Sequence, residues 1–285
     1  MNSSTRDAKI GPAVALVLGA GGTRGWAHVG ALKVLHAAGV PMNLIVGASA
    51  GALIGALYAA RRDAVWVERV AMAFTPTDFL EWSLRDLRLS PRAGGMGRRL
   101  WQACGRLDFR ELAVPFVAVA LDVGSGKPVV LRTGNVGQAV EASIRPPLIG
   151  RPVMRKGRAL VDGGLHNTVP VSVARKLGAE LVISVNVGEF LIVPKAARPL
   201  SARVAAAYRA QSVRPADVWG QLGLLADLMS KDRRWRAEAD IEIRPNLRGI
   251  SPMWPWHIGV AANRGKAAAR RALPAIRRLL AARGA

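Results

Sequence analysis

What the sequence has little of narrows the classes of protein that it can encode. Cys104 is its single cysteine, so no intrachain disulfide can form, and a reducing compartment fits. We expect Cys104 to pack as a small, semi-buried hydrophobic residue. The four histidines form no cluster with cysteine or aspartate at metal-ligand spacing. The sequence therefore predicts neither a metal ion nor any other cofactor.

Acidic residues are also few. The chain holds 19 Asp and Glu against 41 Lys and Arg, which gives a net charge of +22. Such a balance predicts attraction to nucleic acid, anionic lipid or acidic partners, and arginine-rich usage also fits a genome of high GC content. A basic nucleic-acid binder is disfavoured because no recognition helix or base-stacking motif is evident.

Uninterrupted hydrophobic runs are too short to cross a membrane. Residues 44–60 carry no charge over 17 positions, but glycines interrupt them and a membrane helix needs about 20. The apolar stretch 13–20 follows Lys9 as in a signal peptide, yet it has no convincing cleavage site and runs into a glycine loop. We expect a soluble, cytoplasmic protein without a signal peptide or transmembrane helix, which leaves room for peripheral contact with an anionic membrane.

Apolar runs alternate with helical patterns along the chain. Buried strands are expected at 13–18, 44–46, 114–121, 159–161 and 181–186, with a hairpin strand at 128–131 and a late strand at 241–243. Helices are expected at 26–38, 52–60, 64–72, 135–144, 170–177 and 258–282, the last with a kink at Pro274. Repeated alternation of this kind favours a three-layer α/β/α fold with a mainly parallel central sheet. Glycine and proline predict a mobile loop over 89–99.

A single domain is expected after a flexible N-terminus at 1–11. Residues 12–285 would form that domain, in which 13–187 is the core and 240–282 contributes a closing strand and a basic helix. Between them, 188–238 is a helical and loop extension, with helical periodicity at 204–210 and 218–231.

Three short motifs carry the chemistry. Gly47-Ala48-Ser49-Ala50-Gly51 reads G-x-S-x-G between an apolar strand and an apolar helix, where a tight turn exposes the serine hydroxyl and the helix start favours negative charge. A glycine loop at 19–25 follows the first strand, and Asp162-Gly163-Gly164 follows the strand at 159–161. Because loops at the carboxyl ends of parallel strands meet at one edge, we expect the three motifs to share one site.

The glycine loop has two interpretations. As a dinucleotide fingerprint it fails, because Arg24 stands where the third glycine belongs and the second strand does not end on an acid. As an oxyanion hole it fits better, since consecutive glycines let backbone N–H groups point at a substrate oxygen and Arg24 adds a positive field.

Ser49 needs a base, and the histidines are poorly placed. His28 and His36 fall inside the first helix, and His257 falls in an aromatic, proline-rich loop. A triad through His166, four residues after Asp162, would need an unusually tight turn. A Ser49–Asp162 dyad is simpler, because desolvation strengthens a carboxylate as a base, although Asp-Gly-Gly alone is also an ordinary turn.

The three motifs together resemble the patatin-like phospholipase family, in its bacterial single-domain branch. The similarity covers roughly 13–187, and weakly the surroundings of Asp240 and the final helix. It implies a patatin-like fold and a lipid acyl-ester hydrolase that works through an acyl-enzyme. The roles it implies are nucleophile for Ser49, base for Asp162, and oxyanion hole for Gly21, Gly22, Thr23 and Arg24. Ala20 departs from the family pattern, because it replaces the first residue of a glycine triplet.

Large apolar residues fall in regions expected to be loops or short helices. They are Trp82, Met96, Leu100, Trp101, Met253, Trp254 and Trp256. Amphipathic aromatics beside arginines suit a lipid–water interface, and ordinary core packing explains them equally well. The arginine-rich helix at 258–282 suits either anionic lipid or water. A regulatory or adaptor protein that keeps the fold remains the alternative function, and head group, acyl chain and oligomeric state stay open.

Overall fold

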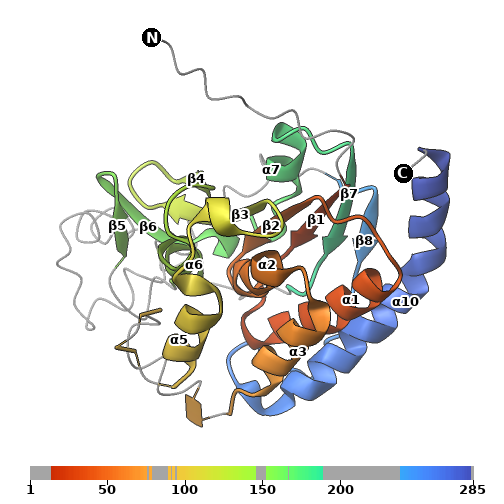
Figure 1. The fold of residues 1–285 in the computed structure, drawn as a ribbon, viewed down its shortest axis with the longest axis horizontal. Coiled ribbons are helices and arrows are strands. Elements are labelled where there is room, and N and C mark those ends of the chain that lie inside the picture. The colour runs from red at the N-terminus through yellow and green to blue at the C-terminus, as the bar shows by residue number, and fades with distance from the viewer. Residues whose placement is uncertain are drawn as a thin grey trace, which may run out of the picture.

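The computed structural model describes residues 14–75, 77–78, 89–90, 92–93, 95–145, 152–165, 167–188 and 238–283. Its centre is a mixed eight-stranded sheet in the order β5-β6-β3-β2-β1-β7-β8, with β4 paired to β3 (Figure 1). The strands are β1 (Val14–Leu18), β2 (Leu44–Ala48), β3 (Phe116–Asp122), β4 (Lys127–Leu131), β5 (Val153–Arg155), β6 (Arg158–Asp162), β7 (Leu181–Val185) and β8 (Ile241–Ile243). The helices are α1 (Trp26–Ala37), α2 (Ala50–Arg61), α3 (Ala64–Met72), α5 (Gly95–Leu100), α6 (Val136–Ile144), α7 (Val171–Lys176) and α10 (Ile258–Ala282).

Side chains of alternate strand residues build two hydrophobic clusters on opposite faces of the sheet. Leu16 and Leu18 belong to the larger cluster, which also takes in α1, α2, α3, α6 and α10. Ala15 and Val17 belong to the smaller one, which α7 covers. Successive strand residues point to opposite faces, so burial on both explains why these strands read as continuous apolar runs. The predicted α/β/α architecture is confirmed.

The half of the sheet from β3 to β8 is parallel. β1 pairs with β2 and β7, β2 pairs with β3, and β7 pairs with β8, all in parallel. Every strand predicted in this half is present within two residues of its expected bounds. Helix α1 lies in the connection from β1 to β2, and helices α2 and α3 lie in the connection from β2 to β3, as parallel pairing requires.

The other half is antiparallel, and here the sequence interpretation needs a correction. β4 pairs back on β3 as predicted, but β6, expected to add to the parallel set, also runs antiparallel to β3. The reason lies in the tight turn at Lys156 and Gly157, both at positive φ, which reverses the chain between β5 and β6. Even so, β6 brings Asp162 opposite Ala120, one position beyond the Val119 that pairs with Ala48.

Helix α10 confirms the predicted basic helix and lies along α1 (Figure 1). Glycines permit this close crossing: a Cβ added to Gly30 would lie 1.8 Å from Ala262 O, and one on Gly265 would lie 1.9 Å from Ala27 O. Pro274, where the sequence predicts a kink, lies inside α10, and Figure 1 shows the helix changing direction along its length. None of the helices in the described residues combines the length and the hydropathy that a membrane-spanning segment requires.

Two expectations for the region before β3 are wrong. Residues 95–99 belong to α5 and not to a mobile loop. Met96 and Leu100, one helical turn apart, are fully buried in the main core, so their packing outweighs the low helix propensity of Gly95 and Gly97. Their interpretation as interfacial residues is wrong for the same reason. Trp82, the remainder of the 89–99 loop at 91 and 94, the N-terminus at 1–11 and the periodic stretches at 204–210 and 218–231 lie outside the described residues.

Candidate active site

Ser49 forms a strained elbow between β2 and α2. Its φ of 53° and ψ of −123° lie where residues other than glycine are rarely found. The chain on both sides is packed too tightly for side chains, because a Cβ on Gly51 would lie 2.0 Å from Leu18 O and one on Gly47 would lie 2.5 Å from Gly51 O. This packing holds the serine in its unusual conformation at the first turn of α2, as in a nucleophile elbow.

A buried serine on α6 fixes the backbone of the elbow. Ser49 N donates a hydrogen bond to Ser143 Oγ at 3.0 Å, and Ser143 Oγ donates to Val119 O at 2.7 Å. Ser143 is fully buried. Sequence reasoning missed this residue, and the available signal was a lone hydroxyl among the apolar positions of the 135–144 helix.

Ser49 and Asp162 meet directly. Ser49 Oγ donates to Asp162 Oδ2 at 2.6 Å, although 113 residues separate them in the chain. The other carboxylate oxygen, Oδ1, accepts from Gly164 N at 2.8 Å, and Asp162 N donates to Arg145 O at 2.8 Å. Both carboxylate oxygens are therefore oriented, one toward the serine and one toward the turn that follows β6.

Burial makes Asp162 a stronger base than an ordinary aspartate. Removal from water raises its pKa from 3.8 to about 6, against the opposing effect of the hydrogen bonds from Ser49 and Gly164. The carboxyl group is therefore mostly ionised at neutral pH, while its affinity for a proton is well above that of a solvated aspartate.

The glycine loop packs against both members of this pair. A Cβ on Gly25 would lie 2.4 Å from Ala50 Cβ, next to the serine, and one on Gly164 would lie 2.2 Å from Ala20 Cβ. All three sequence motifs are thus in van der Waals contact. Their glycines are needed where these backbones approach one another.

Only part of the glycine loop has free N–H groups. Thr23 N donates to Pro252 O at 2.8 Å, and Arg24 N donates to Gly21 O at 3.2 Å. Within the described part of the chain, neither Gly21 N nor Gly22 N donates a hydrogen bond. Of the four residues expected to form an oxyanion hole, the first two therefore keep backbone donors for a ligand.

A loop that is distant in the sequence, at residues 250–254, holds the glycine loop by hydrogen bonds. Thr23 Oγ1 donates to Ser251 O at 2.7 Å and lies 3.2 Å from Trp254 O, while Arg24 Nε donates to Ile250 O at 2.7 Å. These contacts join parts of the chain more than 200 residues apart. Sequence reasoning missed these contacts, because every residue has a backbone carbonyl and the sequence does not indicate which carbonyls accept hydrogen bonds.

None of the described histidines is hydrogen-bonded to Ser49 or Asp162. His28 is fully buried, and its Nε2 donates to Gly19 O at 2.8 Å; burial lowers its pKa to about 4, so it stays neutral and supports the glycine loop. His36 Nδ1 lies 3.1 Å from the Tyr58 hydroxyl, and His257 is exposed at the start of α10. His166, and with it the triad alternative, lies outside the described residues.

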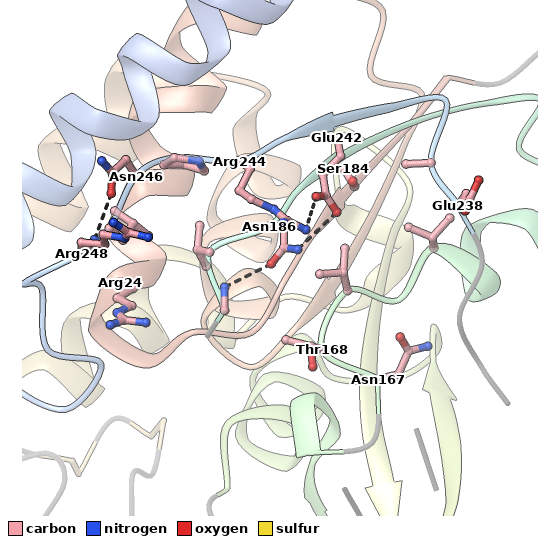
Figure 2. Close-up of a pocket in the computed structure, with 17 residues that line it drawn as sticks. Arg24, Asn167, Thr168, Ser184, Asn186, Glu238, Glu242, Arg244, Asn246 and Arg248 are labelled. Carbon is pink, nitrogen blue, oxygen red and sulfur yellow. Dashed lines mark hydrogen bonds and ion pairs between the residues drawn. The ribbon is translucent and has the colours of Figure 1, made fainter. Parts of the chain in front are cut away.

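A cavity of about 890 Å³ lies beside the glycine loop (Figure 2). Arg24 and Thr168 line it together with residues of β7, β8 and the chain that follows them, such as Asn186 and Arg248, whereas Ser49 and Asp162 do not. The Ser49–Asp162 pair is therefore not part of its lining, although Thr168 Oγ1 donates to Gly164 O of the turn that follows Asp162. Among the described residues, no group of three His, Cys, Asp or Glu side chains is placed to hold a metal ion.

Comparison with known proteins identifies a matching family model and several related chains. The family model for patatin-like phospholipase matches residues 16–175, more than half of the chain. Mouse "Patatin-like phospholipase domain-containing protein 6" is 33% identical over 191 residues, which cover 62% of this chain and 14% of that protein. "Lysophospholipase nte1" of Aspergillus fumigatus is 33% identical over 183 residues, covering 62% of this chain and 12% of its own.

A bacterial relative and a solved structure extend the comparison. An uncharacterized NTE family protein of Mycobacterium bovis is 33% identical over 184 residues, which cover 61% of this chain and 49% of that protein. The crystal structure of VipD from Legionella pneumophila aligns with a TM-score of 0.59 at 13% identity, over 93% of this chain and 67% of the other. At that identity the likeness concerns the fold. The match covers only a small part of the eukaryotic relatives and about half of the bacterial one.

Proposed function

Because this chain belongs to the patatin-like phospholipase family, we propose that it hydrolyses carboxylic esters of lipids, with Ser49 as nucleophile and Asp162 as general base. The observation that carries the proposal is the 2.6 Å hydrogen bond from Ser49 Oγ to Asp162 Oδ2, made at a strained elbow. The printed name of the Aspergillus fumigatus relative, a lysophospholipase, supports an acyl lipid as substrate.

The reaction has two steps. As Ser49 Oγ attacks the ester carbonyl, Asp162 accepts the hydroxyl proton, and a tetrahedral oxyanion forms. When the intermediate collapses, the alcohol leaves with the proton from Asp162 and the acyl group stays on Ser49. A water molecule then gives its proton to Asp162 and attacks the acyl-enzyme, and the fatty acid is released as Ser49 recovers its proton.

The oxyanion hole belongs to Gly21 and Gly22. Their N–H groups are the loop donors that remain without a partner among the described residues, and they follow the part of the loop that contacts the Asp162 turn. Thr23 and Arg24 act as positioning residues, because their bonds to the 250–254 segment hold the loop in place. Backbone donors fixed in advance stabilise a developing oxyanion without reorganisation.

The test is hydrolysis of a chromogenic short-chain ester and of phosphatidylcholine and lysophosphatidylcholine vesicles by the wild type, Ser49→Ala and Asp162→Asn. Ser184→Ala is a matched control, since Ser184 is buried in β7 away from the pair. We expect turnover by the wild type and the control, and its loss in the other two. Equal turnover by all four proteins would rule out Ser49 and Asp162 as a catalytic dyad. A folded but inactive wild type would favour the adaptor function.

A further inference from the structure

The chain between β8 and α10 exposes an unusual group of apolar side chains. Met253, Trp254 and Trp256 are 56%, 52% and 65% exposed, and Val260 follows on α10 at 43%. The two tryptophan rings stack with their centroids 6.5 Å apart. The other exposed large hydrophobic residues of the described chain, Val65, Val130 and Met154, are scattered singly over α3, β4 and β5. Residues 250–257, here called the aromatic loop, therefore form a distinct apolar tip.

The stretch of sequence that contains this tip carries positive charge and no acidic residue. Residues 244–285 contain nine Arg and Lys and no Asp or Glu. The exposed arginines of α10 are Arg270, Arg271, Arg277 and Arg278. They continue the exposed face that starts at Val260 and passes through Asn263 and Ala267. One face of the helix thus changes from apolar to basic over about 27 Å, at 1.5 Å per residue.

We propose that the aromatic loop and the exposed face of α10 dock on an anionic phospholipid bilayer. Tryptophan and methionine at a protruding tip enter the interface between head groups and acyl chains, where amphipathic rings are most stable. Arginines along the adjoining helix face meet the phosphate and carboxylate head groups. A bilayer offers both chemistries in one plane, which matches an apolar tip followed by a row of cations.

The same loop holds the candidate oxyanion hole. Pro252 O accepts from Thr23 N, and Ser251 O and Ile250 O accept from the side chains of Thr23 and Arg24. A Cβ on Gly22 would lie 2.0 Å from Pro252 O, so the two segments are in direct contact. Docking therefore fixes the loop that positions Gly21 and Gly22. This consequence for turnover rests on the proposed function, whereas docking itself does not.

Flotation of the Ser49→Ala protein with vesicles tests docking without catalysis. The vesicles are phosphatidylcholine alone and phosphatidylcholine with about one third phosphatidylglycerol. One variant is Met253→Ser/Trp256→Ser, and a second replaces Arg270, Arg271, Arg277 and Arg278 by Gln. One matched control is Val130→Ser/Met154→Ser, and the other replaces Lys127, Arg132, Lys156 and Arg158 by Gln. Both alter exposed residues of the antiparallel half of the sheet. Circular dichroism checks the fold of each protein.

We expect binding to the anionic vesicles that weakens with added salt, and a loss of at least about tenfold in each docking variant. Both controls should bind as the parent does. In the active protein, replacement of Arg270, Arg271, Arg277 and Arg278 by Gln should lower vesicle hydrolysis and leave hydrolysis of the short-chain ester intact, because these arginines lie on α10 and outside the 250–254 segment that holds the glycine loop. No binding by the parent, or unchanged binding by the folded docking variants, would overturn the proposal. Docking without hydrolysis by the active protein would instead count against the proposed function.

Discussion

The two halves of the sheet deliver the two members of the Ser49–Asp162 pair in different ways. The parallel half holds Ser49 by backbone packing, with a positive φ and glycines pressed against Leu18. The antiparallel half brings Asp162 on β6, and what is unusual there is electrostatic: a carboxyl group whose pKa burial raises to about 6. The backbone geometry is unusual at Ser49, the proposed nucleophile, and the basicity is unusual at Asp162, the proposed base. Substitutions around Ser49 should therefore disturb the position of its hydroxyl, whereas substitutions at Asp162 should change proton transfer and its pH dependence.

The largest expected effect comes from removing either reactive group. Ser49→Ala should lower kcat/KM by at least about 10⁴-fold, because the acyl-enzyme cannot form. Asp162→Asn should lower it by about 10³- to 10⁴-fold, since the amide cannot accept the proton but leaves the glycine loop in place. Steady-state hydrolysis of a short-chain ester measures both. A loss below tenfold in Asp162→Asn would show that another group serves as the base.

The same Asp162→Asn substitution should stabilise the fold at neutral pH. The folded pKa of about 6 exceeds the usual 3.8, so the folded state binds more protons than the unfolded state between these values. The aspartate thus destabilises the protein increasingly as pH rises from about 4 to 6. We expect the free energy of unfolding of the asparagine variant to exceed that of the wild type by about 1 to 3 kcal/mol above pH 7, and the difference to vanish below pH 4.

Urea unfolding at pH 4 and pH 8 measures this difference in the free energy of unfolding between the two proteins. His28 also contributes to the pH dependence, since its lowered pKa weakens the fold as pH falls below about 6.5, but that contribution is common to both proteins and cancels in their difference. An asparagine variant less stable than the wild type at pH 8 would contradict the assignment of Asp162 as a base strained by burial.

The pH dependence of activity tests whether Asp162 acts as the base. If Asp162 accepts the proton, kcat/KM should rise with pH through about 6 and then level, because only the ionised carboxylate is a base. A pH profile on a short-chain ester at constant ionic strength measures it. A midpoint near 4 would mean that Asp162 behaves as a solvated carboxylate.

Ser143→Ala tests the support of the elbow. The substitution leaves Ser49 N without its partner in a buried place, at a cost of about 1 to 3 kcal/mol in the free energy of unfolding. We expect kcat to fall by about tenfold through misplacement of Ser49, with KM little changed. Ser143→Thr, which keeps the hydroxyl, should recover part of the rate. A Thr variant as slow as the Ala variant would argue for a packing role alone.

The smallest effect concerns the strained backbone itself. Glycine tolerates the φ of 53° at position 49, so Ser49→Gly should be more stable than Ser49→Ala by about 1 kcal/mol. Both lack the hydroxyl, which makes them a matched pair. Thermal unfolding of the two proteins at pH 8 compares them, and a more stable alanine variant would show that the elbow stores no strain.

The sequence predicted the parallel half better than the antiparallel half for a physical reason. Strands buried on both faces and the Ser49 turn are local patterns, which hydrophobic runs and glycine spacing reveal. The direction of β6 depends on a two-residue reversal at Lys156 and Gly157, and the support of Thr23 comes from backbone carbonyls more than 200 residues away. Contacts of that kind arise only when the chain has folded, as does the hydrogen bond from Ser49 N to Ser143.

Reaction with a fluorophosphonate, followed by intact mass and peptide mapping, shows whether Ser49 is a nucleophile, because this probe forms a covalent bond with an activated serine. We expect one adduct per wild-type chain, on Ser49, no adduct on Ser49→Ala, and much slower labelling of Asp162→Asn. An adduct on another residue, or equal labelling of the Ser49→Ala protein, would contradict this expectation.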